Sequence, residues 1–555
     1  MTTQTDPRLA ARQVVTGLTA PGAPFELVRE DVLGAPVTLF AHRKRALHEV
    51  LAESVVHGDR TYVATLEEQV SFAEHAAMVS SLARALREDH GVRQGDRVAI
   101  ASANNLEWIL VFWAAASIGA VTVGFNAWWS TRELAYGLTH ARPTLVVADD
   151  KRRAQLAEIA ATDDVDLPVL GLEDVRCLAA AYPDAPLPSA DVAEDDPAVI
   201  LYTSGTSGRP KGATHSHRNL LSVVEYHRMN DALMAAFGDP TDPRDRTYLL
   251  VMPLFHIASL HNLALPRLAT GSKVALHLGA FKVDPVMRLV ERERVTNWGA
   301  VPTMATRLLE ADLSPYDTSS LRAFALASAP SSPQLKERLR TQLPFASSLV
   351  DSYGLTESCT AVAAANPMDL AEAPGTLGHP IVGVELEVRD GQGRPVPDGV
   401  EGEICVRSAY NMLGYWEDDE ATERTIRADR WLHTGDLGVR DEAGRISLSS
   451  RRSDLIIRGG ENVYPAEVEG VLAEHPDVAE CIVMGVTHAE LGQEVGAVVV
   501  PTAGAQLEGL EERLREHAAG ALAYFKVPTR WKVARSPLPR NATGKVVRRE
   551  IALEA

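Results

Sequence analysis

Apolar runs of strand length alternate with helix-like patterns through the first part of the chain. Four short runs rich in Val, Ile, Leu and Ala are typical of buried strands: residues 97–102, 119–126, 143–149 and 198–204. Between the first three runs, residues 106–117 and 130–141 have the length and composition of helices. Strands that alternate with helices predict an α/β protein with parallel sheets.

The pattern changes in the last third of the chain. After about Ala371, Gly- and Pro-rich turns separate short strands such as 384–390 and 402–408, which predicts a small β subdomain. From Asp454 onward, strand and helix patterns predict a compact α/β unit. The expected fold class is therefore α/β, with a large N-terminal domain of parallel sheets and a β subdomain, followed by a small C-terminal α/β domain.

One uncharged segment is long enough to cross a lipid bilayer. Residues 108–129 are 22 positions without a charged side chain, and a membrane-spanning helix needs about 20. Gly119 and Gly124 interrupt the segment and its second half is β-branched, so we predict a buried helix followed by a strand. A membrane span is the alternative. The N-terminus has no apolar core behind a basic start, so no signal peptide is expected.

Composition narrows the expected partners. The 555 residues carry 55 basic and 74 acidic side chains, a net charge of −19, which disfavours nucleic acid as a partner. The cysteines are widely spaced and form no CxxC pair, so their spacing predicts neither a zinc site nor a disulfide framework. They are Cys177, Cys359, Cys405 and Cys481. A reducing, cytoplasmic location is therefore expected.

A loop rich in Gly, Ser and Thr follows the strand pattern that ends near Thr203. Its sequence, "YTSGTSGRPKG" (202–212), combines glycines that let the backbone approach an anion with hydroxyl donors and one lysine. In the P-loop of nucleotide hydrolases the lysine directly follows the last glycine, whereas here Arg209 and Pro210 intervene. The residues predicted to surround phosphate are Thr203, Ser204, Gly205, Thr206, Ser207, Gly208 and Lys211. On composition alone, a plain surface turn is the alternative.

Four more motifs follow this loop in order, and the set resembles the adenylate-forming superfamily of acyl-CoA synthetases, luciferases and nonribosomal peptide synthetase adenylation domains. The motifs are "DSYGLTES" (351–358), "WLHTGDLG" (431–438), "RRSDLIIRGGENVYPAEVE" (451–469) and "PRNATGKVVRRE" (539–550). The resemblance covers residues 72–550. It implies ATP, Mg²⁺ and coenzyme A as substrates, with no tightly bound metal or prosthetic group. It also implies an N-terminal domain (1–450), a hinge (451–455) and a mobile C-terminal lid (456–555).

The resemblance assigns residues to the first reaction, in which a carboxylate attacks the α-phosphorus of ATP and forms an acyl-adenylate. It implies Glu357 and Thr203 as the groups facing Mg²⁺. Thr356 is expected to donate to the α-phosphate, and Tyr353 to offer a flat face to adenine. Asp436 is expected to accept hydrogen bonds from the ribose hydroxyls. The other residues implied at the ATP or AMP site are Ser328, Ala329, Pro330, Asp351, Gly354 and Arg451.

Further positions are implied for the reacting centre and for transfer to coenzyme A. Lys545 is expected to bridge the carboxylate and the α-phosphate from the C-terminal domain. Gly459 and Gly460 match the floor of the pantetheine tunnel, and His256 matches a position between this tunnel and the acyl pocket. The basic tail 526–549 is explained by anionic ATP and coenzyme A; a nucleic-acid or membrane patch is its alternative.

The implied acyl pocket is hydrophobic. Its candidate residues are His256, Ile257, Trp298, Val301 and Ala329. An amino-acid-activating relative would carry an early aspartate, and "LFHIASLH" (254–261) contains none. The sequence therefore favours a hydrophobic acid. A medium- or long-chain fatty acid is the first expectation, and a branched, alicyclic or aryl acid is the second.

The chain departs from the family pattern at three places. Ser207 stands where Thr is usual, and Ala327 and Ser328 stand where many members have two glycines. The added β-carbons are expected to reshape the acyl pocket. At the hinge position Ser453 replaces the usual Asp or Lys and Asp454 follows, so the pivot is predicted at one of these two residues.

Three other functions share these motifs. One is an enzyme that stops at the acyl-adenylate or loads a carrier protein, another is a luciferase-like oxygenase, and the third is a non-catalytic nucleotide-binding module. The presence of Glu357, Asp436 and Lys545 argues against the third. The expected partners are a small carboxylic acid, ATP and coenzyme A, with peripheral membrane contact at most, and the sequence leaves a homodimer open.

Overall fold

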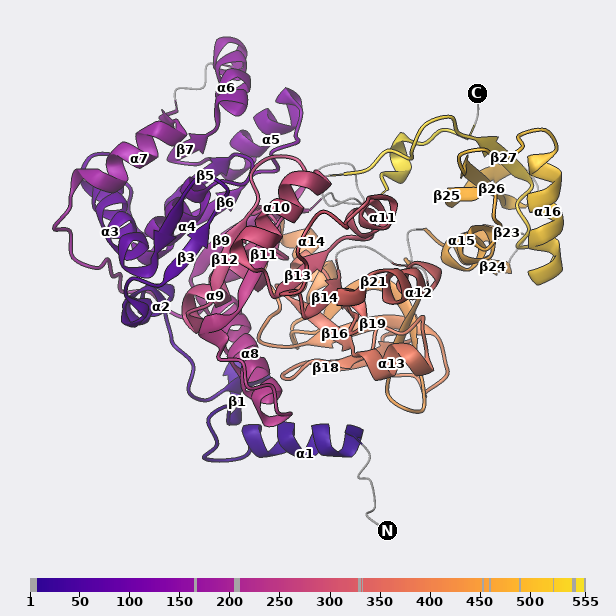
Figure 1. The fold of residues 1–555 in the computed structure, drawn as a ribbon, viewed down its shortest axis with the longest axis horizontal. Coiled ribbons are helices and arrows are strands. Elements are labelled where there is room, and N and C mark those ends of the chain that lie inside the picture. The colour runs from indigo at the N-terminus through magenta and orange to yellow at the C-terminus, as the bar shows by residue number, and fades with distance from the viewer. Residues whose placement is uncertain are drawn as a thin grey trace.

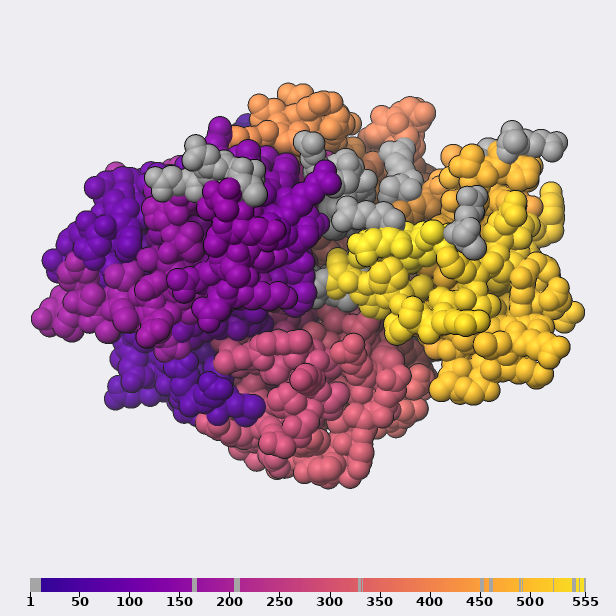
Figure 2. All heavy atoms as spheres, turned by 90° about the horizontal axis from the view of Figure 1, so that it is seen from above, coloured from indigo at the N-terminus to yellow at the C-terminus, as the bar shows by residue number. Residues whose placement is uncertain are grey.

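The chain folds into a large α/β body and a smaller C-terminal unit. The computed structural model describes residues 7–163, 167–203, 210–327, 331, 333–451, 454–458, 461–488, 491–522, 524–541 and 546–553. Figure 1 shows the C-terminal unit, in yellow, as a lobe at one side of the body. Figure 2 shows from above that this lobe lies against the end of the body. The predicted α/β class, with a large N-terminal and a small C-terminal part, is confirmed.

The helices of the body surround its sheets, and the C-terminal lobe has helices of its own (Figure 1). In chain order they are α1 (Pro7–Thr19), α2 (Leu47–Ser54), α3 (Phe72–Glu88), α4 (Leu106–Ser117), α5 (Thr131–Ala141), α6 (Asp150–Asp163), α7 (Leu172–Ala181), α8 (His217–Ala236), α9 (Leu265–Thr270), α10 (Val283–Glu293), α11 (Pro302–Glu310), α12 (Pro333–Gln342), α13 (Pro367–Glu372), α14 (Asp419–Thr425), α15 (Pro465–Ala473) and α16 (Leu510–Ala521).

The first large sheet contains the four strands predicted from apolar runs. Its order is β20 (Gly414–Tyr415), β10 (Lys211–Ser216), β9 (Pro197–Thr203), β6 (Val121–Gly124), β5 (Arg97–Ala101), β7 (Leu145–Ala148) and β8 (Val169–Leu170). The strands from β9 to β8 run parallel, whereas β10 is antiparallel to β9 and β20 is antiparallel to β10. This antiparallel edge carries the phosphate-loop sequence.

Helix α4 and strand β6 account for the long uncharged segment. The side chain of Asn105 accepts a hydrogen bond from the Trp108 amide and caps the start of α4. Every residue of α4 is buried, and the helix packs against α2, α3 and β6 inside the body. The predicted helix followed by a strand is confirmed. Among the described helices, none combines the length and the apolar composition needed to cross a bilayer.

The second large sheet lies beside the first and has a core of its own. Its order is β17 (His379–Pro380), β16 (Ala361–Ala365), β15 (Val350–Gly354), β14 (Ala323–Leu326), β13 (Asn297–Ala300), β11 (Thr247–Leu250), β12 (Lys273–Leu276), β3 (Thr61–Ala64) and β4 (Gln69–Ser71). Trp298 and Phe324 meet edge to face in this core, with ring centroids 5.6 Å apart. Burial of these two rings holds β13 and β14 together, next to β15, which contains the start of the motif 351–358.

Three smaller sheets complete the described part of the chain. The β subdomain, as predicted, is a sheet ordered β18 (Glu385–Arg389), β19 (Gly402–Arg407), β21 (Leu432–Arg440) and β22 (Ile446–Arg451). The C-terminal sheet contains β23 (Ile456–Arg458), β24 (Glu461–Val463), β25 (Val478–His488), β26 (Gly492–Pro501) and β27 (Arg530–Val533). Near the N-terminus, β1 (Leu27–Val32) and β2 (Ala35–Phe40) form a hairpin. The proposed hinge, 451–455, lies where the chain leaves β22 and enters β23.

Candidate active site

The phosphate-loop sequence joins two antiparallel strands. Thr203 ends β9 and Lys211 begins β10, and these two residues are direct partners in the strand register. The pairing places both residues at the base of the same loop. The intervening predicted residues lie outside the described part of the chain: Ser204, Gly205, Thr206, Ser207 and Gly208.

Lys211, Tyr415 and Glu357 form a cluster beside this loop. Strand β20 pairs with β10, with Tyr415 opposite Ala213. The Lys211 ammonium nitrogen lies 4.9 Å from the centre of the Tyr415 ring. The Tyr415 hydroxyl donates a hydrogen bond of 2.7 Å to Oε1 of Glu357, which stands on the short 3₁₀ helix Thr356–Ser358. The cluster therefore links the phosphate loop to the predicted Mg²⁺ carboxylate.

Tyr415 is a site residue that the sequence analysis missed. Burial and the negative charge of Glu357 raise the pKa of Tyr415 far above its ordinary value, so the phenol remains a hydrogen-bond donor at any working pH. Its signal in the sequence was the aromatic pair Tyr415–Trp416 after "LG", which is too short to predict a contact across the fold.

Loss of the Tyr415 hydroxyl is expected to weaken ATP-dependent turnover about tenfold, because a hydrogen bond to a charged group contributes roughly 1.5–3 kcal/mol. The measurement is kcat/KM for pyrophosphate release by Tyr415→Phe at several Mg²⁺ concentrations. Tyr316→Phe is the matched control, since it removes a Tyr–carboxylate bond of the same 2.7 Å length, to Asp284, at an exposed position. Equal rates for the two variants would contradict a role of Tyr415 at the site.

Tyr353 and Asp436 bring a second pair of motifs together. The Tyr353 hydroxyl donates a hydrogen bond of 2.7 Å to Oδ2 of Asp436, and both residues are buried. Asp436 stands on β21 opposite Arg451 on β22, the last strand before the proposed hinge. The carboxylate predicted to hold ribose is thus oriented by the tyrosine predicted to face adenine. The structure does not describe the side chain of Arg451.

Asp351 and Gly354 have clear structural partners. The Lys336 ammonium lies 2.6 Å from Oδ2 of Asp351, and the Ser331 hydroxyl donates to the same oxygen at 3.0 Å. This buried ion pair fastens α12 to β15. A β-carbon at Gly354 would stand 2.5 Å from the Thr360 carbonyl oxygen, so only glycine fits. Both residues shape the segment that carries Tyr353 and Glu357. The neighbouring predicted residues Ser328, Ala329 and Pro330 lie outside the described residues.

His256 lies in the turn after β11, at the junction of the two large sheets. Gly124 at the end of β6 permits this turn to approach, because a β-carbon there would lie 3.3 Å from Cβ of Phe255. Loss of hydration lowers the pKa of His256 to about 4, so its imidazole is neutral at physiological pH. Phe255 packs edge to face on the half-exposed Trp128, with centroids 5.2 Å apart. An aromatic pair therefore adjoins the predicted junction of acyl pocket and tunnel.

The other acyl-pocket candidates lie in different surroundings. Ile257 follows His256 and packs against the core of the first sheet. Val301 is buried at the start of α11. Trp298 belongs to the core beneath α10 and α12, where its contact with Phe324 accounts for its burial. Ala329 lies outside the described residues.

The C-terminal unit approaches the body near the proposed hinge. Tyr464 donates a hydrogen bond to Glu401 across the two units. Asp454 forms an ion pair of 3.3 Å with Arg548 inside the C-terminal unit. An isolated bridge joins Arg540 to Val546, on either side of the segment that contains Lys545. Lys545, Gly459, Gly460 and Ser453 themselves lie outside the described residues.

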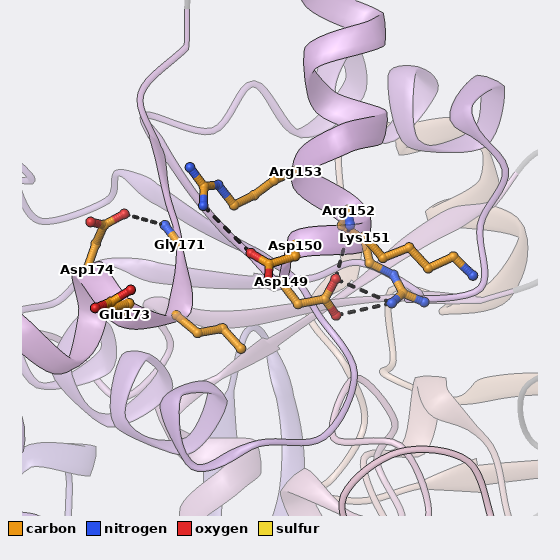
Figure 3. Close-up of a pocket in the computed structure, with 9 residues that line it drawn as sticks. Asp149, Asp150, Lys151, Arg152, Arg153, Gly171, Glu173 and Asp174 are labelled. Atoms are coloured by element: carbon orange, nitrogen blue, oxygen red, sulfur yellow. Dashed lines mark hydrogen bonds and ion pairs between the residues drawn. The ribbon is translucent and has the colours of Figure 1, made fainter.

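A separate hollow of about 460 Å³ lies at the edge of the first large sheet. Figure 3 shows two ion pairs among its charged side chains, Asp149 with Arg152 and Asp150 with Arg153. The hollow lies at the starts of α6 and α7 and contains none of the motif residues.

Comparisons with known proteins identify the family. The AMP-binding enzyme family model matches residues 51–416, and the model of the AMP-binding enzyme C-terminal domain matches residues 467–545. A feruloyl-CoA synthase from Amycolatopsis sp is 34% identical over 484 residues, which are 87% of this chain and 93% of that protein.

Solved structures show the same architecture. The o-succinylbenzoate CoA synthetase of Bacillus subtilis with its acyl-adenylate intermediate has a TM-score of 0.79 at 28% identity, covering 91% of this chain and 98% of that one. An anthranilate CoA ligase with anthranoyl-AMP has a TM-score of 0.82 at 25% identity, covering 92% and 96%. The expected superfamily is confirmed: the chain belongs to the family of AMP-binding enzymes.

Proposed function

We propose that this AMP-binding enzyme joins a hydrophobic, ring-bearing carboxylic acid to coenzyme A. In the first step a carboxylate oxygen bonds to the α-phosphorus of ATP, and the bond to pyrophosphate breaks. In the second step the sulfur of coenzyme A bonds to the acyl carbon, and AMP leaves. The observation that carries the proposal is a pair of contacts: Tyr353 with Asp436, which joins the motifs 351–358 and 431–438, and Tyr415 with Glu357, which links the first of these motifs to the strand beside the phosphate loop.

The first step requires cations and donors, because two anions must approach each other. Lys211 and the Thr203 hydroxyl stand at the base of the loop and would hold the β- and γ-phosphates. Glu357 and Thr203 offer the oxygen ligands that Mg²⁺ prefers, and bound Mg²⁺ would offset phosphate charge. Tyr415 fixes the position of the Glu357 carboxylate. Asp436, oriented by Tyr353, would accept hydrogen bonds from the ribose.

The choice of a ring-bearing acid rests on the aromatic surroundings of His256 and on the relatives. Phe255 and Trp128 present ring faces and edges, which pack well against another ring. His256 is neutral, so it adds no charge to an apolar acyl group. The relatives named above are ligases of feruloyl, succinylbenzoate and anthranilate groups. We therefore place a ring-bearing acid ahead of the unbranched fatty acid that the sequence first favoured.

A panel of acids tests the proposal directly. AMP and acyl-CoA are measured for aryl, alicyclic and unbranched fatty acids, each with and without coenzyme A. We expect AMP and acyl-CoA in equal amounts. We expect kcat/KM to be at least about tenfold higher for the best ring-bearing acid than for the best unbranched fatty acid, which corresponds to a difference of roughly 1.4 kcal/mol.

Each other outcome points to a different function. AMP release that ignores coenzyme A would indicate an enzyme that stops at the acyl-adenylate or loads a carrier protein. A preference for unbranched chains would restore the fatty-acid hypothesis. Light emission with luciferin would indicate an oxygenase, and ATP binding without turnover on any acid would indicate a binding module.

A further inference from the structure

A cysteine, a histidine and a glutamate converge on one face of the β-subdomain sheet. Cys405 on β19 and His433 on β21 are direct partners in the strand register, and Glu403 stands two residues before Cys405. The Cys405 sulfur lies 3.5 Å from Nδ1 of His433, and the same nitrogen lies 3.1 Å from Oε2 of Glu403. The three possible ligand atoms, one from each residue, all lie within 4.8 Å of one another.

Two of these separations are close to the ligand spacing of a tetrahedral zinc site. Zinc–sulfur, zinc–nitrogen and zinc–oxygen bonds of ordinary length place neighbouring ligand atoms about 3.4–3.6 Å apart. We propose that Cys405, His433 and Glu403 bind a divalent ion of the zinc class, with a water molecule or a small anion as the fourth ligand. Little movement is required, because two of the contacts already have nearly this length.

The ligand set separates this site from the Mg²⁺ used in adenylation. A thiolate and an imidazole favour Zn²⁺ and similar ions, whereas Mg²⁺ prefers oxygen ligands only. The cysteine spacing gave no sign of such a site, because only one ligand is a cysteine and His433 lies 28 positions further along the chain. The pairing of β19 with β21 brings the ligands together.

The neighbouring charges on this face are paired with each other. Across from Cys405 on β18, Glu387 forms an ion pair of 2.8 Å with Arg389. Arg389 and Arg407 both lie over the ring of Trp431, and Arg407 also pairs with Glu385. Both arginines therefore have a carboxylate partner of their own beside the site. The side chains of His433 and Glu403 remain 13% and 12% exposed, which leaves a route for an ion.

The site adjoins the residue proposed to hold ribose. Oε1 of Glu403 accepts a hydrogen bond of 3.0 Å from the amide of Gly435, directly before Asp436. His433 belongs to the same segment. An ion held by Oε2 of Glu403 and by His433 would therefore tie both ends of the segment 433–436 to β19, while the bond to Gly435 is kept.

Cobalt binding tests the proposal independently of enzyme activity. Co²⁺ is titrated into the full-length protein in a Cys177→Ser background, which removes the exposed thiol. We expect a thiolate-to-cobalt absorption band that saturates at one equivalent and disappears when Zn²⁺ is added. Cys405→Ser should abolish the band, and the matched control Cys481→Ser, in the C-terminal unit, should keep it.

A second variant covers the case in which Cys405→Ser fails to fold. Glu403→Gln retains the shape of the side chain and is expected to weaken Co²⁺ binding at least about tenfold, as loss of an anionic ligand does. Absence of the band in the Cys177→Ser protein, survival of the band in Cys405→Ser, or unchanged affinity in Glu403→Gln would each overturn the proposal.

Discussion

Replacement of Lys545 by alanine is expected to slow acyl-adenylate formation about 100–1,000-fold, the usual cost of losing one group that stabilises charge in a transition state. The carboxylate and the α-phosphate are both anionic, so their approach needs a cation between them. Thioester formation from supplied acyl-adenylate should continue at nearly the normal rate, since in that step no carboxylate has to approach the phosphate. The two half-reactions are measured separately, by pyrophosphate release and by acyl-CoA formation.

Lys526 provides the control for Lys545. It belongs to the same basic tail, but its ammonium nitrogen is paired with Glu467 at 2.6 Å within the C-terminal unit. Lys526→Ala should leave acyl-adenylate formation within about twofold of the unmodified enzyme, because exposed ion pairs contribute little. If Lys545→Ala loses both half-reactions equally, or neither, its proposed role at the reacting centre is wrong.

Several strands and helices of the body were predictable because buried elements are visible in the sequence as short runs of apolar residues. Strands β5, β6, β7 and β9 are apolar on both faces, and α4 is apolar around its whole circumference. Such runs contrast with the polar turns on either side, so their type is clear from the sequence. The motif residues were assigned from the resemblance of five ordered motifs to a known family, and their roles remain predictions.

Contacts between the motifs were not predictable from the sequence. Tyr415 reaches Glu357 over 58 positions, and Tyr353 reaches Asp436 over 83. Each contact depends on which strands pair and in which register, and a single sequence does not contain that information. The contact of Trp298 with Phe324 in the core beneath α10 and α12 was likewise not predictable, and a place of Trp298 beside the acyl group remains a prediction. The position of a residue in the sheets, and not its type, decides which residues it contacts.

Mild acid is expected to destabilise the protein well before its carboxylates titrate. His75, His215 and His217 are fully buried, and burial lowers their pKa values to about 3, 3 and 4. The unfolded chain therefore binds more protons than the folded chain below about pH 6.5. Stability is fully present above that pH and falls as pH decreases toward the folded pKa values. Between pH 7.5 and 5.5, each histidine should remove roughly 1.4 kcal/mol, about 4 kcal/mol together.

The free energy of unfolding in urea, measured at the two pH values, tests this expectation. His217→Gln should reduce the difference by roughly 1.4 kcal/mol, because the Nδ1 atom of neutral His217 accepts a hydrogen bond from the Leu47 amide that protonation would remove. His42→Gln is the control, since the side chain of His42 is 62% exposed and its protonation costs little folding energy. A stability that stays level from pH 7.5 to 5.5 would mean that the buried imidazoles take up protons without unfolding. Equal pH dependence in the two variants would instead place the acid-sensitive groups elsewhere in the body.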